Sequence, residues 1–271
     1  MSRTAGPDWE TAHVAVRTHP GCVRTSNEDT VLVGDWVQSG TMTNTVCHEL
    51  TLTTPVVCAV ADGMGGHAAG DEASWLALRR LVTAAPALTD ERAIRDTLLR
   101  IEDELNAAGS RPDLHGMGTT VAGVVLEAGY LSWFNVGDSR VYREQEGFLR
   151  QLSVDDAVTV WIDGRETRTG ELTQCLGGGS RGFDVVHLDR EPLHLGRRYL
   201  VCSDGLTDAL DQSALEGALT ADAAEMAQDL VDLALRAGGR DNVSVIVVAP
   251  GGGVAQKASR DGGVRGGESH G

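Results

Sequence analysis

Residues 56–66 read VVCAVADGMGG, and this stretch decides how the chain folds. A continuous apolar run that ends in a glycine-rich turn is typical of a buried strand, and this run delivers one carboxylate, Asp62, at its end. The glycines at 63, 65 and 66 leave the backbone bare beyond the acid, so a ligand can approach its carbonyl and amide groups. We therefore expect a central buried strand that leads into a ligand site.

A second stretch repeats this pattern later in the chain. Residues 199–205 read YLVCSDG, which is another short apolar strand followed by an acid and a glycine. The acid is Asp204. Two strands that each end in Asp-Gly suggest one metal site shared by Asp62 and Asp204.

The composition suits a globular chain with a sizeable core. The sequence has 271 residues, of which 41% are hydrophobic. This length allows one large domain or two small ones, and we favour one domain over residues 12–249. The glycine-rich stretch over 250–271 carries mixed charge and no apolar periodicity, so we expect a disordered tail there.

The charge balance and the apolar runs limit the partners. A formal net charge of -16 argues against binding to nucleic acid or to an anionic membrane, because phosphate groups favour clustered Lys and Arg. The sequence has no N-terminal apolar signal and no run of about 18 apolar residues that could span a bilayer. The five cysteines are scattered and form no C-x-x-C pair. We expect a cytoplasmic, monomeric protein with reduced thiols.

Runs of strands that alternate with pairs of one-sided helices indicate an α+β fold with sheets inside and helices outside. We expect loops or an edge hairpin over 34–54 and loops over most of 151–182. The strands are expected near 13–18, 30–33, 56–62, 119–126, 130–136, 139–142, 185–188, 199–202 and 243–248, and the helices near 71–84, 90–108, 207–219 and 221–237.

Four acids stand at turns beside the apolar strands, namely Asp29, Asp62, Asp204 and Asp241. Carboxylate oxygens without His or Cys partners suit hard cations such as Mg²⁺ or Mn²⁺. Two such ions would make a water nucleophilic at neutral pH and would hold a phosphoryl group during in-line attack. Arg24 could bind two phosphate oxygens with its planar guanidinium. Each feature alone is more often a plain turn or a solvated surface residue.

Taken together and in order, these features resemble the metal-dependent protein phosphatases of the type 2C serine/threonine family, in its bacterial branch. The resemblance covers about residues 12–249, which is nearly the whole chain. The motifs that carry it are GxxRxxNED from Gly21, DGMGGH from Asp62, GMGTT from Gly116, NxGDSR from Asn135, SDGL from Ser203 and DNxS from Asp241.

The resemblance implies a four-layer αββα sandwich, in which two central antiparallel sheets are flanked by pairs of helices. It also implies a centre of two Mn²⁺ or Mg²⁺ ions at one end of the sheets. In this family pattern Asp62 and the carbonyl of Gly63 would serve both ions, Asp29 one ion, and Asp204 and Asp241 the other.

The same resemblance assigns further roles. Arg24 would bind the substrate phosphate and would act in catalysis with Asp62 and Asp204. Asp138 would help to hold a weak third metal, and Glu28 would accept hydrogen bonds from water on the metals. One departure is the segment 155–157, DDA, which lacks the His and Ser of the family's flap. The flap is therefore expected to be trimmed.

Two functions from different classes remain open at this point. One is an active phosphatase that hydrolyses phosphoserine and phosphothreonine in proteins and opposes a cognate bacterial serine/threonine kinase. The other is a pseudophosphatase that binds phosphoproteins or regulates a partner without turnover. The intact set of four Asp residues favours the enzyme, because a chain free of catalytic constraint has no reason to keep every ligand.

Overall fold

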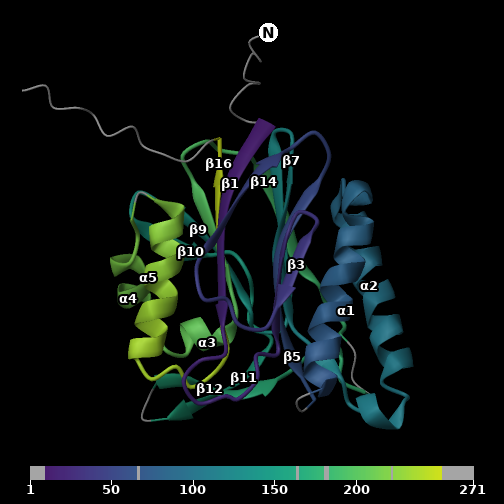
Figure 1. Cartoon of the computed structure of the whole chain (residues 1–271). Coiled ribbons are helices and arrows are strands. Elements are labelled where there is room, and N and C mark those ends of the chain that lie inside the picture. Colours follow the sequence, from purple (N-terminus) through teal and green to yellow (C-terminus); the bar gives the residue numbers. More distant parts are fainter. Residues whose placement is uncertain (1–9, 66–67, 163–164, 180–182, 221, 252–271) are drawn as a thin grey trace, which may run out of the picture.

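The computed structural model describes residues 10–65, 68–162, 165–179, 183–220 and 222–251. Residues 66 and 67 of the DGMGGH motif and most of the tail predicted over 250–271 lie outside the described residues, so the prediction of a disordered tail stays a prediction. Two large antiparallel sheets form the centre of the molecule, and helices cover the outer face of each sheet (Figure 1).

The first sheet has six strands in the order β10-β9-β15-β16-β1-β4. Its two central strands are almost wholly apolar, as expected for strands covered on both faces. The bounds are β10 Phe148–Gln151, β9 Arg140–Gln145, β15 Arg198–Cys202, β16 Val243–Pro250, β1 Thr11–His19 and β4 Val46–Thr51.

The second sheet has eight strands, and the stretch that opened the sequence analysis forms its central strand, β5. The path β13-β6-β5-β7-β8-β14 is extended by β2, which pairs with β5 and with β3. The bounds are β13 Leu176–Gly177, β6 Gly118–Thr119, β5 Val56–Met64, β7 Val121–Glu127, β8 Tyr130–Val136, β14 His187–Pro192, β2 Asp29–Val33 and β3 Trp36–Ser39.

The helices begin where side chains cap them. Asp90 accepts a hydrogen bond from the backbone of Ala93 at 2.7 Å, and Asp222 does the same for the helix that follows it. Such caps satisfy backbone N–H groups that lack a partner in the first turn. The helices are α1 Ala68–Ala84, α2 Glu91–Ala108, α3 Asp204–Thr207, α4 Gln212–Gly217 and α5 Ala223–Arg236, with 3-10 turns η2 Ala85–Ala87 and η3 Pro112–Leu114.

Three apolar layers hold these elements together, which confirms the predicted four-layer αββα sandwich. The middle layer lies between the sheets and contains Val16, Val60 and Ile246. A second layer packs α1 and α2 on the eight-stranded sheet. The third packs α4 and α5 on the six-stranded sheet, with Leu230 and Val247 fully buried. This layering buries both faces of each sheet and leaves the strand ends to form a site.

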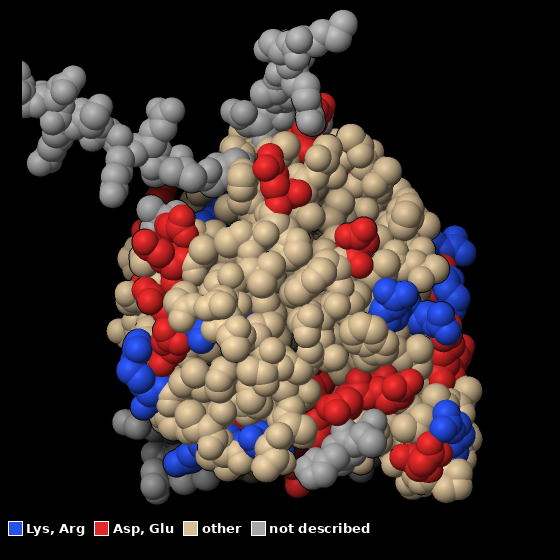
Figure 2. All heavy atoms as spheres, viewed as in Figure 1, with Lys and Arg blue, Asp and Glu red and all other residues tan. Residues whose placement is uncertain are grey.

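Charged side chains follow the same layering. On the face shown in Figure 2, Lys, Arg, Asp and Glu lie mainly over the helices at either flank, while the central band carries few of them. Both signs of charge are mixed within each flank. No described helix combines the length with the apolar composition that a membrane span needs.

The structure corrects several sequence predictions. Strand β5 carries Asp62 as predicted but extends two residues beyond it to Met64, because β6 continues the pairing at Gly63 and Met64. The loop or edge hairpin expected over 34–54 consists instead of two edge strands, β3 and β4, that belong to different sheets. The expected loop over 151–182 contains a hairpin of β11, Ala157–Ile162, and β12, Arg165–Leu172, which forms its own sheet.

Gly123 in β7 provides a test of how tightly the second sheet packs. A Cβ atom there would lie 2.8 Å from the Cβ of Ala59 and 2.8 Å from the ring of Phe134. Gly123→Ala should therefore lower the free energy of unfolding by about 1–3 kcal/mol, the usual cost of overpacking a core.

The matched control is Gly217→Ala in α4, where an added Cβ meets nothing within 4 Å. It should leave stability unchanged or raise it by up to about 1 kcal/mol, since Ala favours the helix. Denaturant unfolding of both variants measures the difference, and equal stabilities would contradict the packing argument.

Candidate metal centre

Asp29 and Asp62 face each other across two neighbouring strands. Asp29 begins β2, Asp62 lies near the end of β5, and the antiparallel register pairs them directly. Like charges at opposite positions on two strands repel, so this pairing is unfavourable on its own. The register therefore places two acids together at a cost that a bound cation could offset.

The six-stranded sheet brings a second pair of acids to the same end. Asp204 follows β15 as the first residue of α3, and Asp241 lies just before β16. A Cβ on Gly205 would lie 2.0 Å from the carbonyl oxygen of Asn242, so only glycine allows these two turns to touch. Asp204 lies close enough to Asp62 across the two sheets to help raise the pKa of Asp62.

Asp29 is the most enclosed of these carboxylates. One of its oxygens, Oδ2, accepts hydrogen bonds from the hydroxyls of Ser203 at 2.8 Å and Ser244 at 2.6 Å. Its other oxygen, Oδ1, is buried without a hydrogen-bond partner among the described residues. A buried oxygen of this kind is costly unless something binds it, and a cation would do so.

Because the acids lie close together and are buried, the pKa values of Asp29 and Asp62 are raised. Burial raises the pKa of Asp29, and the charges of Asp204 and Asp241 add to the rise, while the two serine hydroxyls oppose it. Burial likewise raises the pKa of Asp62, and Asp29, Asp204 and Asp138 contribute further. Both carboxylates resist ionisation in the absence of a counterion, as expected for acids that share one site.

Asn242 holds the loop that carries Arg24 against this cluster. Its amide donates to the carbonyls of Pro20 at 3.1 Å and Ser26 at 2.9 Å, and its oxygen accepts from the backbone of Glu28 at 2.8 Å. The loop is thereby fixed to the start of β16, at the edge of the acid cluster.

Arg24 pairs with the acid next to Asn242. Its Nη2 lies 2.7 Å from Oδ2 of Asp241, and this hydrogen bond raises the pKa of the guanidinium. The side chain of Arg24 remains 57% exposed, so most of its donors face the open side of the site. An incoming phosphate could reach them from that side.

Glycines allow Glu28 to approach the same site. A Cβ on Gly63 would lie 2.1 Å from the carbonyl oxygen of Gly70, and a Cβ on Gly70 would lie 2.1 Å from Oε2 of Glu28. The backbone of Gly63 also donates to the carbonyl of Glu28 at 3.2 Å. The start of α1, the end of β5 and Glu28 are thus packed backbone against backbone.

Asp138 enters the site from a turn that crosses between the sheets, because β8 and β9 belong to different sheets. Gly137 adopts φ of +99°, and a Cβ there would lie 2.7 Å from the side chain of Thr120. Thr120 and Ser139 share a hydrogen bond of 2.7 Å, which fixes the turn from its other side. Asp138 itself is buried.

A cavity of about 790 Å³ joins these groups. Of the eight residues predicted for the site, all except Asp29 line it, and Asp29 is buried opposite Asp62 in the strand pairing. Residues 170–174, which are the end of β12 and the two residues that follow it, line it as well. The lining residues from the prediction are Arg24, Glu28, Asp62, Gly63, Asp138, Asp204 and Asp241.

The site fits a divalent cation by charge and by donor type. Among the described residues, no three acidic, His or Cys side chains are already gathered as a ligand cage. However, the donors are all oxygens, two of the acids have raised pKa values, and Asp29 keeps an unsatisfied buried oxygen. Hard oxygen donors with concentrated negative charge suit Mg²⁺ and Mn²⁺.

The segment that departs from the family flap anchors the β11–β12 hairpin. Asp155 accepts three hydrogen bonds from Arg140, the shortest at 2.6 Å. Asp156 accepts from the backbone of Gly137 at 2.9 Å and contacts Nε2 of His187 at 2.8 Å. These acids tie the base of the hairpin to the turn that carries Asp138.

Sequence reasoning did not identify the polar residues that support the acid cluster, although these residues lie inside the motifs. Ser203 and Asn242 are direct neighbours of Asp204 and Asp241, and Ser244 follows two residues later. A hydroxyl or amide side chain beside a predicted metal ligand was the sequence feature that could have indicated this supporting role. Their pairing with Asp29 and with the Arg24 loop depends on tertiary contacts.

The comparisons with known proteins agree with this geometry. A family model described as protein phosphatase 2C matches residues 46–237, more than half of the chain. The serine/threonine protein phosphatase PstP of Mycobacterium tuberculosis is 34% identical over 249 residues, covering 86% of this chain and 44% of that protein. The serine/threonine phosphatase stp of Listeria monocytogenes is 32% identical over 258 residues, covering 87% and 95%.

A solved structure of a protein phosphatase has a similar fold. It is the catalytic domain of serine/threonine protein phosphatase PstP in complex with two manganese ions, with a TM-score of 0.69 and 30% identity. The match covers 88% of this chain and 98% of that one. The chain thus spans less than half of the mycobacterial protein's length and nearly all of the Listeria protein.

The acid cluster predicts a stability response to metal. Adding Mn²⁺ to chelator-treated protein should raise its melting temperature, because an ion at 100 times its Kd stabilises the fold that binds it by about 2.7 kcal/mol. Asp62→Asn should remove most of the rise, since it deletes a charge at the centre of the cluster. Differential scanning calorimetry with and without Mn²⁺ measures this.

Asp103→Asn, on the exposed face of α2, is the matched control and should keep the full rise. An equal response to Mn²⁺ in Asp62→Asn and Asp103→Asn would place the ion elsewhere.

Proposed function

The chain belongs to the protein phosphatase 2C family, and from this we propose that it hydrolyses phosphoserine and phosphothreonine in proteins. The observation that carries the proposal is the meeting of Asp62, Asp204 and Asp241 with Arg24 in one cavity. Anionic oxygens that attract divalent cations, beside a guanidinium that binds phosphate oxygens, suit phosphoryl transfer to water.

We propose that Asp62 and the carbonyl of Gly63 contact both of two Mn²⁺ or Mg²⁺ ions. Asp29 would serve one ion, and Asp204 and Asp241 the other. When bound, these ions would supply a nucleophilic water at neutral pH and charge stabilisation for the phosphoryl group. Two manganese ions in the PstP catalytic domain support the proposed number and type of metal. Asp138, buried in the same cavity, is the proposed ligand of a weaker third ion.

The remaining residues would position the substrate phosphate, the water in the cavity and the side chain of Asp29. Arg24 faces the open side of the site and would hold the phosphate oxygens of the substrate. Glu28, packed against Gly70, would accept hydrogen bonds from water in the cavity. Ser203 and Ser244 would keep Asp29 in one orientation by donating to its Oδ2. This rigid support matters because misplacing a reacting group by about 1 Å can cost a hundredfold in rate.

A pseudophosphatase that binds phosphoproteins without turnover is the alternative, and the complete set of acids favours the enzyme over it. Phosphoproteins are made by kinases, so a cognate serine/threonine kinase is the proposed opposing enzyme. A cytoplasmic site of action and a monomeric state belong to the same proposal.

Replacing a proposed ligand should remove activity and leave the fold intact. Asp204→Ala and Asp241→Ala should each lower kcat for a phosphothreonine peptide by about a thousandfold or more, because they delete groups used in the transition state. Asp103→Ala is the control on α2 and should keep wild-type turnover. Phosphate release in Mn²⁺ measures activity, and circular dichroism checks the fold. Retained turnover in both ligand variants would overturn the proposed roles.

Arg24 should behave differently from the ligands. If it binds the phosphate equally in the ground and transition states, Arg24→Ala should raise KM about tenfold and change kcat less. Arg24→Lys keeps the charge but loses the planar pair of donors, so its KM should lie between that of the wild type and that of Arg24→Ala. Steady-state kinetics on a phosphopeptide separate these effects. An unchanged KM in Arg24→Ala would show that the arginine does not bind phosphate.

A further inference from the structure

A second groove opens beside the proposed catalytic cavity. Its volume is about 1150 Å³, and Asp241 lines both hollows. A phosphorylated side chain in the cavity must be carried by a polypeptide that leaves through a neighbouring opening. The groove is large enough for several residues and begins at a proposed metal ligand, so it offers such a path.

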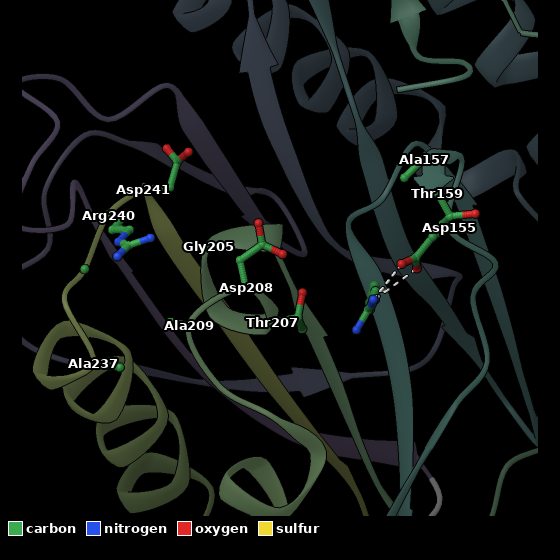
Figure 3. Close-up of a pocket in the computed structure, with 12 residues that line it drawn as sticks. Asp155, Ala157, Thr159, Gly205, Thr207, Asp208, Ala209, Ala237, Arg240 and Asp241 are labelled. Carbon is green, nitrogen blue, oxygen red and sulfur yellow. Dashed lines mark hydrogen bonds and ion pairs between the residues drawn. The ribbon is translucent and has the colours of Figure 1, made fainter. Parts of the chain in front are cut away.

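The two walls of the groove come from distant parts of the sequence. Figure 3 shows Thr207, Asp208 and Arg240 on one side, and Ala157 and Thr159 on the other. The first wall is α3 with the turn before β16, and the second is strand β11 of the hairpin. The Asp155 anchor described above fixes the base of the second wall to Arg140.

Arg240 is the exposed cation of the first wall. It forms no ion pair or side-chain hydrogen bond within the part of the chain that the structure describes, whereas Arg140 on the other wall is held by Asp155. In Figure 3 the carboxylate of Asp241 points away from Arg240. The backbone beside Arg240 is fixed, because the carbonyl of Gly239 accepts a hydrogen bond from Cys22 at 2.6 Å.

Trp161 extends the second wall. Thr159 lines the groove, and the pairing of β11 with β12 is regular from Thr159 to Ile162, after an irregularity between Ala157 and Thr159. Side chains on such a regular stretch alternate between the two faces of the strand. Trp161, two residues after Thr159 on β11, therefore lies on the groove face. It is 74% exposed, which is a large apolar side chain in water at the rim of a groove. Exposed aromatic side chains of this kind are typical anchors for a bound chain.

We propose that this groove binds the substrate polypeptide next to the phosphorylated residue. An acidic side chain of the substrate lies at Arg240, and an apolar side chain packs on Trp161. The proposal rests on the proposed function, since it extends the same site. It names the substrate class as phosphoproteins with an acidic residue near the phosphorylated one.

The first experiment varies the charge beside the phosphothreonine. Two peptide sets carry either Glu or Lys at one flanking position at a time, and p-nitrophenyl phosphate serves as a substrate too small to reach the groove. In the wild type, Glu at one of these positions should raise kcat/KM about tenfold over Lys, as complementary charges do. Arg240→Glu should reverse this preference and leave p-nitrophenyl phosphate hydrolysis within about twofold of the wild-type rate.

The matched control is Arg95→Glu, an exposed arginine on α2 at the opposite flank of the molecule. It should keep the wild-type preference, which separates a local contact from a change in net charge. Trp161→Ala should lower kcat/KM for peptides with an apolar flanking residue several-fold, again without effect on p-nitrophenyl phosphate.

Three results would overturn the proposal. One is an equal loss on peptides and p-nitrophenyl phosphate in Arg240→Glu, which would mean that Arg240 acts through Asp241. The second is equal kcat/KM for Glu and Lys peptides at every position in the wild type. The third is a wild-type preference for Lys, which would give the dominant contact to Asp208 on the same wall.

A binding assay separates the groove from the proposed function. If the wild type hydrolyses neither substrate, the phosphatase proposal fails, while the groove is still tested with a fluorescent peptide that carries a non-hydrolysable phosphonate. Tighter binding of the Glu peptide, lost in Arg240→Glu, would support the groove. Equal anisotropy curves for the Glu and Lys peptides would overturn it.

Discussion

The repulsion between carboxylates held at the shared end of the two sheets is the constraint on which the site depends. Asp29 and Asp62 are paired by strand register, and Asp204 joins them from the other sheet. Charges placed this close in a buried setting are tolerated only with partners or counterions. Hydroxyls of Ser203 and Ser244 supply part of that support, and a divalent cation would supply the rest. The cluster of acids thus destabilises the metal-free fold, and a bound divalent cation would offset this cost.

The three apolar layers make this arrangement possible. Because both faces of each sheet are covered, the strands are held rigidly and their ends cannot rearrange to separate the acids. Glycines at 63 and 205 then let turns from different elements touch backbone to backbone, where any side chain would collide. The family match at residues 46–237 leaves out Arg24, Asp29 and Asp241, yet the pairing of β1 with β16 and of β2 with β5 brings all three to the site.

The hairpin over β11 and β12 contributes to both the proposed catalytic cavity and the proposed substrate groove. Its base lacks the expected His and Ser, but Asp155 and Asp156 anchor it to Arg140 and to the turn that carries Asp138. One arm lines the catalytic cavity and the other lines the neighbouring groove. If the proposed groove binds substrate, changes in this hairpin would alter substrate choice without touching the acids proposed to hold metal.

From the sequence alone come the α+β class, most strands and helices, and eight candidate site residues, because apolar periodicity and short motifs are local properties. Seven of these eight residues line one cavity. The sequence did not predict the β11–β12 hairpin, because β12 reads RETRTGEL, a polar run without the apolar alternation that marks a half-buried strand. Nor could it show that Ser203 and Ser244 hold Asp29, or that Thr159 and Arg240 face each other across one groove. Those relations join residues far apart in the chain, and only strand register and layer packing bring them together.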